Sequence, residues 1–253
     1  MTNKLKYFIG NWKMFGDFGS FKIIHEINQF SYKSKNISKN KKIILCVPNV
    51  LIFFFNKKLK SKFISLGAQN CHFYQNSGPF TGAVNATMLK KSGAQYVILG
   101  HSDNRLEGDT NQIIKKKIKS ALCENLNVIY CIGETFKEKK RHQTFPILKK
   151  QIINSLDKKF NINKIIFAYE PVWSIGTNKI PNPIELKKTI KFIKGVIEKN
   201  FRPRGIPKVL YGGSVNDKNI NIFSSIVEID GFLIGGASQS SKKFIDIIKN
   251  YYK

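Results

Sequence analysis

The chain of 253 residues has few cysteines, few acidic residues and no long hydrophobic run. Its four cysteines stand far apart without a Cys-x-x-Cys pair, which argues against a disulfide framework and against a zinc site. The longest apolar run, IILCVPNVLIFFF, is interrupted by Pro48 and Asn49, and it is shorter than the roughly 18 residues of a membrane helix. The N-terminus has no signal-peptide pattern. We therefore expect a soluble, cytoplasmic protein with buried, reduced thiols and no metal site.

The scarcity of acidic residues gives the chain an unusual charge. Only 16 residues are Asp or Glu against 43 that are Lys or Arg, so the net charge is +27. Nucleic-acid sites favour Arg for forked contacts to phosphates and bases, yet only four of the basic residues are Arg. The lysines are spread over every helical segment and form no single block. We interpret them as a solvated surface and expect no nucleic-acid partner, with polyanion binding as the alternative.

Short apolar runs recur along the whole chain. There are eight: KYFIGN, KIILCVP, KFISLGAQN, YVILGH, NVIYCIGE, KIIFAYEP, KVLYGGS and GFLIGGAS. Each is nearly continuous in apolar residues, which is typical of strands that are covered on both faces. Segments with apolar residues at helical spacing, such as FKIIHEINQF, lie between most of them. This alternation predicts an α/β fold of the (β/α)₈ barrel type, formed by residues 1–253 as a single domain.

Polar residues follow several of these predicted strands. Asn11 and Lys13 follow the first, His101 the fourth and Glu170 the sixth. Glycine-rich turns follow the last two strands and contain Gly212, Gly213, Ser214, Gly235 and Gly236. Active sites of such barrels lie at the carboxyl ends of the strands, and a phosphate binds near the last two. These residues supply a carboxylate, an imidazole and an ammonium beside a predicted phosphate-binding turn. Such a set indicates proton transfer on a small phosphorylated carbonyl compound.

Six motifs in fixed order carry a family resemblance: GNWKM, GHSDNR, YCIGET, AYEPVWSIGT, YGGSV and GFLIGGAS. Along nearly the whole chain they resemble the triosephosphate isomerase family. The resemblance implies interconversion of dihydroxyacetone phosphate and D-glyceraldehyde 3-phosphate, a step of glycolysis and gluconeogenesis, without cofactor or metal. One rival is another phosphate-binding barrel enzyme, such as an epimerase or an aldolase. Another is a catalytically weakened barrel with a polyanion-binding surface.

The same resemblance implies a role for each matching residue. Glu170 matches the base, and His101 matches the neutral imidazole; the family is the standard example of this pair. Lys13 matches the ammonium that stabilises negative charge, and Asn11 lies beside it. The substrate phosphate would be bound by Gly176, Ser214, Gly235 and Gly236.

A closing lid is the next element that the resemblance implies. It comprises Pro171, Val172, Trp173, Ser174, Ile175, Gly176, Thr177, Asn178 and Lys179. A lid of this kind excludes water from the bound intermediate. Asn178 stands where the family more usually has Gly, which predicts a stiffer hinge.

The resemblance also implies roles for two residues after the histidine and for one long loop. Ser102 and Asp103 match residues that support the histidine and the lysine, although Asp103 is one methylene shorter than the family's usual Glu. The long loop from Asn70 to Thr81 resembles the loop that inserts into a neighbouring subunit in this family. We therefore expect a homodimer.

Overall fold

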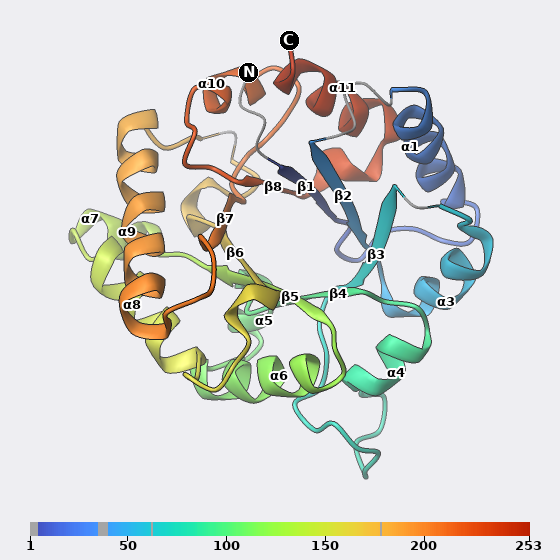
Figure 1. Ribbon diagram of the computed structural model, residues 1–253, viewed down its shortest axis with the longest axis horizontal. Coiled ribbons are helices and arrows are strands. Elements are labelled where there is room, and N and C mark those ends of the chain that lie inside the picture. Colours follow the sequence, from blue (N-terminus) through green and yellow to red (C-terminus); the bar gives the residue numbers. More distant parts are fainter. Residues whose placement is uncertain (1–4, 35–39, 62, 178) are drawn as a thin grey trace.

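The computed structural model describes residues 5–34, 40–61, 63–177 and 179–253. Eight parallel strands pair in chain order, and the last pairs with the first, so the sheet is a closed barrel (Figure 1). The strands are β1 (Lys6–Asn11), β2 (Lys41–Cys46), β3 (Ile64–Ala68), β4 (Tyr96–Leu99), β5 (Asn127–Ile132), β6 (Ile165–Tyr169), β7 (Lys208–Tyr211) and β8 (Gly231–Ile234). The predicted (β/α)₈ barrel is confirmed.

Helices surround the barrel as an outer ring (Figure 1). The α-helices are α1 (Phe21–Lys33), α3 (Asn49–Lys58), α4 (Ala86–Lys91), α5 (Ser102–Leu106), α6 (Asn111–Cys123), α7 (Phe136–Lys140), α8 (Thr144–Ser155), α9 (Pro183–Phe201), α10 (Ile220–Ser224) and α11 (Ser241–Tyr251). Three 3₁₀ turns are η1 (Ile162–Lys164), η2 (Val172–Ser174) and η3 (Gly236–Gln239). None of the helices in the described ranges is long and apolar enough to cross a membrane.

Each strand buries both of its faces. One cluster of buried side chains comes only from strands and fills the barrel, as with Ile9, Ile98 and Ile129. A larger cluster combines the alternate strand residues, such as Phe8, with side chains of the outer helices, such as Ile24. Neighbouring residues of a strand point to opposite faces, so burial on both faces requires a continuous apolar run. This is why the eight strands were recognisable in the sequence.

A capping side chain and a glycine set the ends of two helices. The Asn182 side chain caps α9 by accepting a hydrogen bond from the Ile184 N–H, and Pro183 occupies the first helical position. Gly93 follows α4 with a φ of +104°, a conformation that favours glycine. Of the four thiols, Cys123 is exposed, so the expectation that all four are buried was wrong for this residue at the end of α6.

The segment from Asn70 to Thr81 has no helix or strand, as predicted. Its aromatic side chains stack on one another: the ring centroids of His72 and Phe73 are 4.4 Å apart, and those of Tyr74 and Phe80 are 4.8 Å apart. Tyr74 is 51% exposed and Phe80 is 38% exposed. The loop therefore presents an ordered aromatic surface to the outside of the barrel.

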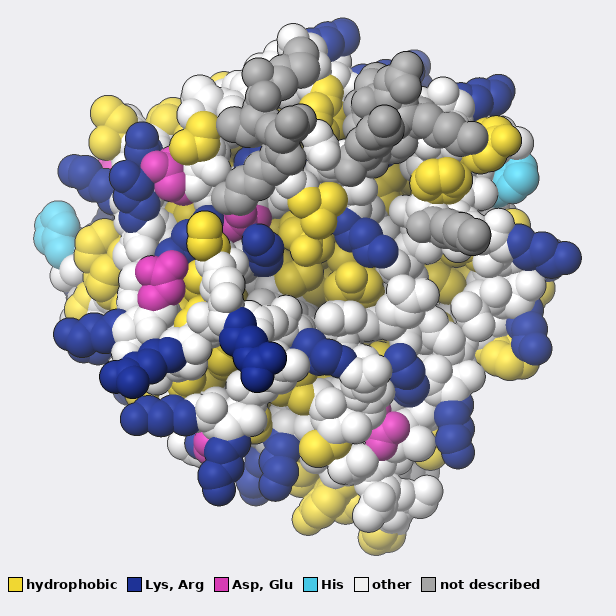
Figure 2. Space-filling model, in the orientation of Figure 1, with side chains coloured by type: hydrophobic (Ala, Val, Ile, Leu, Met, Phe, Trp, Pro, Cys, Tyr) yellow, Lys and Arg dark blue, Asp and Glu magenta, His cyan; other side chains and the backbone are white. Residues whose placement is uncertain are grey.

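Basic side chains are spread widely over the face shown in Figure 2, among apolar and acidic ones. Few of the ion pairs of the described residues are well buried. In one of them the Lys117 ammonium lies 2.7 Å from both oxygens of Asp109 and 3.0 Å from the Asn70 side-chain oxygen. This pair ties the base of the aromatic loop to α6.

The buried pair gives a stability prediction. Asp109→Asn leaves the Lys117 ammonium largely buried without its carboxylate, and we expect a loss of about 3 kcal/mol in the free energy of unfolding. Asp157→Asn is the matched control, because its pair with Lys115 is solvent-exposed and contributes little. Urea denaturation of both variants measures the difference. Equal stability of the two variants would contradict the prediction.

Candidate functional site

A pocket of about 390 Å³ opens at the carboxyl ends of the barrel strands. It brings together residues that are far apart in the sequence. Nine of the predicted site and lid residues line it: Asn11, Lys13, His101, Glu170, Ile175, Gly176, Ser214, Gly235 and Gly236. Two predicted supporting residues, Ser102 and Asp103, do not line it and lie in the first turn of α5.

Glu170 follows β6 and is only 4% exposed. Its Oε1 lies 3.4 Å from Nε2 of His101, while its Oε2 has no hydrogen-bond partner among the described residues. Two glycines make room for it. A Cβ atom on Gly212 would lie 2.6 Å from Glu170 Cγ, and one on Gly133 would lie 1.8 Å from the Glu170 carbonyl oxygen. The glycines therefore allow a buried carboxylate with one free oxygen.

His101 links the end of β4 to α5. Its Nδ1 accepts a hydrogen bond of 3.1 Å from the backbone N–H of Asp103, and the side chain thereby caps the helix. A ring nitrogen that accepts from an amide carries no proton, so this bond assigns the proton of the neutral imidazole to Nε2. The Nε2–H then points toward Glu170 and the pocket.

Lys13 follows β1 with a φ of +54°, which is uncommon for a residue with a side chain. Its backbone N–H donates to the Asn11 Oδ1 at 3.2 Å. Its ammonium lies 3.0 Å from Asp103 Oδ2, and the same oxygen lies 3.4 Å from His101 Nδ1. The shorter Asp103 thus reaches Lys13 directly and also approaches the imidazole.

The Cys131 thiol beside Glu170 and the Tyr211 phenol beside Ser174 remain protonated at neutral pH. Burial raises the pKa of Cys131 well above its usual value, and the neighbouring Glu170 charge adds to this. Burial also raises the pKa of Tyr211 to about 12, although its hydrogen bond with Ser174 lowers it. These two groups therefore do not compete with Glu170 and His101 for protons near pH 7.

The wall beneath β7 and β8 is built mostly from backbone. Gly235 and Gly236 line the pocket at the start of η3, and a Cβ on either would meet no atom within 4 Å. Ser214 fixes the neighbouring turn by donating from Oγ to the Ser174 carbonyl oxygen at 2.6 Å. Gly-rich turns of this kind bind anions through backbone N–H groups. This wall of the pocket therefore has the composition of an anion-binding turn.

The predicted lid contains the turn η2. Trp173 Nε1 donates to Glu134 Oε1 at 2.9 Å, and Ser174 Oγ lies 3.0 Å from the Tyr211 hydroxyl oxygen. Only Ile175 and Gly176 of the lid line the pocket; Gly176 has a φ of +68°. Pro171, Val172, Thr177 and Lys179 do not line it, and Asn178 lies outside the described residues.

Sequence reasoning assigned no role to several residues of this region. Glu134, which anchors Trp173, stands in the motif YCIGET, so the signal was present without the contact. Gln239 donates to the Trp12 carbonyl oxygen at 2.8 Å and lines the pocket one residue beyond the motif GFLIGGAS. The other unpredicted lining residues are Val215, Asn216, Leu233 and Ala237. Over the described ranges, no group of three His, Cys, Asp or Glu side chains is placed to hold a metal ion.

Fold and site together define a (β/α)₈-barrel enzyme whose pocket suits acid–base chemistry on a small anion. The model of the family described as triosephosphate isomerase matches residues 6–251. The chain belongs to the triosephosphate isomerase family, and its activity is triosephosphate isomerisation.

Relatives with this name match over almost their whole length. The triosephosphate isomerase of Dictyoglomus thermophilum is 38% identical over 97% of this chain and 99% of its own. That of Thermodesulfovibrio yellowstonii is 37% identical over 96% of this chain and 98% of its own. The crystal structure of triosephosphate isomerase from Bartonella henselae superposes with a TM-score of 0.88 at 34% identity, covering 98% of this chain and 99% of that one.

The space made by Gly212 gives a prediction for activity. Gly212→Ala places a Cβ 2.6 Å from Glu170 Cγ, so the carboxylate must move, and we expect kcat to fall by about tenfold or more. Gly195→Ala is the control, because a Cβ there meets nothing and alanine favours helix α9. A coupled assay measures both variants. Unchanged kcat in Gly212→Ala would contradict the expected displacement.

Proposed function

We propose that Glu170, His101, Lys13 and Asn11 carry out the isomerisation in this chain, as one catalytic domain of residues 1–253. The reaction moves a proton between adjacent carbons of dihydroxyacetone phosphate to give D-glyceraldehyde 3-phosphate, and it is reversible. The observation that carries the proposal is the buried pair of Glu170 Oε1 and His101 Nε2, 3.4 Å apart at the wall of one pocket.

In the proposed mechanism Glu170 is the base. It removes a proton from the carbon next to the carbonyl group and returns it to the neighbouring carbon, so no proton is lost overall. His101 donates its Nε2 proton to the carbonyl oxygen and recovers a proton from the other oxygen. The enediolate that forms between these steps is stabilised by the Lys13 ammonium and the Asn11 amide.

The substrate phosphate occupies the wall formed by Ser214, Gly235 and Gly236. Gly176 of the lid reaches it through its backbone N–H when the lid closes. Closure excludes water, which strengthens the charge interactions in the pocket and prevents loss of phosphate from the enediolate. The positive net charge attracts the anionic substrate. No cofactor takes part in these steps, and we place the reaction in cytoplasmic glycolysis and gluconeogenesis.

The polyanion-binding alternative receives no support from the site. Asn11, Lys13, His101 and Glu170 all line one pocket, which is the arrangement that catalysis requires. The lysines are spread over the visible face and not gathered into one groove (Figure 2).

A homodimer is part of the proposal. The aromatic loop from Asn70 to Thr81 would pack beside Lys13 of a second copy. Its exposed rings support this, as does Met14, whose side chain is fully exposed next to Lys13. Exposed apolar surface of this kind marks protein interfaces.

Substitution of the proposed base is the direct test. Glu170→Gln keeps the shape of the side chain but cannot accept the carbon-bound proton, and we expect kcat to fall about 10²–10⁴-fold with little change in KM. Glu198→Gln, an exposed position on α9, is the matched control. Turnover is measured with glyceraldehyde 3-phosphate in a coupled assay. A Glu170→Gln variant as active as the control would remove Glu170 from the mechanism.

The dimer has its own test. Tyr74→Glu places a charge in the centre of the aromatic loop, and we expect it to weaken self-association by at least tenfold. Tyr32→Glu changes an equally exposed tyrosine on α1 and serves as the control. Sedimentation equilibrium across a concentration series measures both variants. A wild-type chain that sediments as a fully active monomer would refute the dimer.

A further inference from the structure

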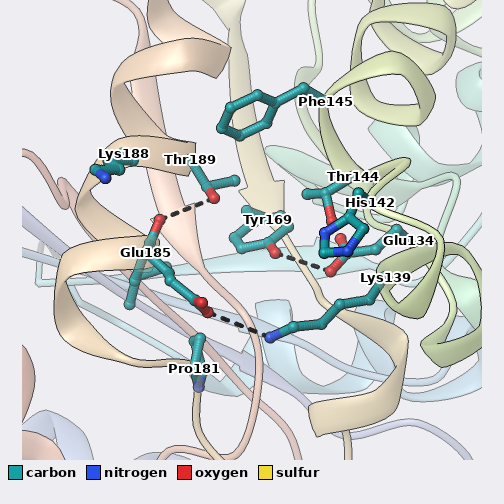
Figure 3. Close-up of a pocket in the computed structure, with 11 residues that line it drawn as sticks. Glu134, Lys139, His142, Thr144, Phe145, Tyr169, Pro181, Glu185, Lys188 and Thr189 are labelled. Atoms are coloured by element: carbon teal, nitrogen blue, oxygen red, sulfur yellow. Dashed lines mark hydrogen bonds and ion pairs between the residues drawn. The ribbon is translucent and has the colours of Figure 1, made fainter.

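A second cavity, of about 230 Å³, lies outside the barrel mouth between the starts of α8 and α9 (Figure 3). It shares no lining residue with the 390 Å³ pocket. Drug-sized ligands occupy roughly 300–1,000 Å³, so this cavity suits a smaller molecule of a few carbon atoms. Its walls contain both charged and apolar side chains, so a matching ligand carries both charged and apolar groups.

A buried carboxylate stands at the inner end of this cavity. Glu134 is 1% exposed, and its Oε1 accepts hydrogen bonds from Trp173 Nε1 at 2.9 Å and from the Tyr169 hydroxyl at 3.2 Å. Its Oε2 is buried and has no hydrogen-bond partner among the described residues. Burial raises the pKa of this carboxyl group, whereas its hydrogen bond with Trp173 acts in the opposite direction. An unpartnered buried carboxylate oxygen is costly, and a cationic donor compensates it best.

Basic groups border the same cavity farther out. Lys139 extends across the opening, and its ammonium lies 3.4 Å from Glu185 Oε2 (Figure 3). That pair is solvent-exposed, so it is weak and leaves Lys139 able to bind another anion. His142 also lines the cavity. It lies in the turn between α7 and α8 with a φ of +56°.

The remaining wall is apolar. Phe145 of α8 and Leu186 of α9 also line the cavity. A complementary ligand therefore carries an ammonium, a carboxylate and a small apolar group. Neither a simple anion nor a simple amine satisfies both ends.

We propose that this cavity binds a small apolar amino acid, with its ammonium on Glu134 and its carboxylate between Lys139 and His142. Such a ligand is of the right size and leaves no charged end of the cavity unpaired. This site is separate from the pocket in which isomerisation is proposed to occur, because the two share no lining residue.

The cavity is connected to the lid through Trp173. The indole N–H is held by Glu134, and the Lys139 ammonium lies 3.9 Å from the centre of the ring. An ammonium on Oε2 keeps Glu134 ionised, so the bond from Trp173 becomes charge-assisted and stronger. An amino acid bound in this cavity therefore favours the arrangement in which Trp173 is hydrogen-bonded to Glu134, and it slows the motion of the lid. This regulatory effect rests on the proposed role of the lid in turnover, whereas binding itself does not.

Binding is tested without any assay of turnover. The full chain labelled with 5-fluorotryptophan gives one ¹⁹F NMR signal for each of its two tryptophans, Trp12 and Trp173. We expect L-valine to shift the Trp173 signal saturably and to leave the Trp12 signal in place. Isobutylamine, which lacks the carboxylate, and isovalerate, which lacks the ammonium, should bind at least tenfold more weakly. Saturating inorganic phosphate throughout keeps the catalytic pocket filled.

Two variants assign the binding to Glu134. Glu134→Gln keeps an oxygen that can accept from Trp173 but removes the charge, and it should weaken L-valine binding at least tenfold. Glu198→Gln loses the same charge from the exposed face of α9 and should bind like the wild type. No saturable shift, equal binding of isovalerate, or equal affinities of the two variants would overturn the proposal and leave a cavity that holds only water.

The effect on turnover is measured separately. Saturating L-valine should lower kcat for isomerisation about two- to fivefold in the wild type and leave Glu134→Gln unaffected. Saturable binding without a change in kcat would overturn the regulatory role while keeping the site. An inactive wild type that still binds L-valine would count against the proposed function and not against this cavity.

Discussion

Closure of the barrel is the constraint on which the rest of the structure depends. Every strand is hydrogen-bonded to two neighbours, and both of its faces are buried, so polar side chains have almost no place in the middle of a strand. Chemistry is confined to the rim, where the strands end. Glu170, His101 and Lys13 come from three different strand ends and still meet, because parallel strands in a closed sheet all end at the same rim.

At this rim, contacts between neighbouring loops decide the geometry. The His101 ring is oriented by a backbone N–H of its own helix, and Asp103 from that helix holds the Lys13 ammonium. The Glu170 carboxylate is positioned mainly by packing, since Gly212 has no Cβ and thereby leaves room for it. Hydrogen bonding thus fixes the imidazole and the ammonium, and packing fixes the carboxylate.

The sequence predicted the fold and many of the residues that line the pocket, because both depend on short-range patterns. Continuous apolar runs identify strands buried on both faces, and the residue after each run necessarily lies at the rim. Contacts between distant residues leave no such pattern. The approach of Asp103 to both Lys13 and His101 depends on how α5 starts. The hydrogen bond from Trp173 to Glu134 joins the ends of two strands, and the position of His142 depends on the turn between α7 and α8.

Two buried carboxylates follow neighbouring strands, Glu134 after β5 and Glu170 after β6, and each has one oxygen without a hydrogen-bond partner among the described residues. Such an oxygen destabilises the fold unless something else uses it. For Glu170 the use is the proton that it exchanges in the proposed mechanism. Glu134 lines the other cavity and not that pocket, so the same reasoning favours a donor that binds in its own cavity. The predicted lid residue Trp173 hydrogen-bonds to Glu134, so the carboxylate that holds Trp173 is also the one that the proposed amino-acid ligand would contact.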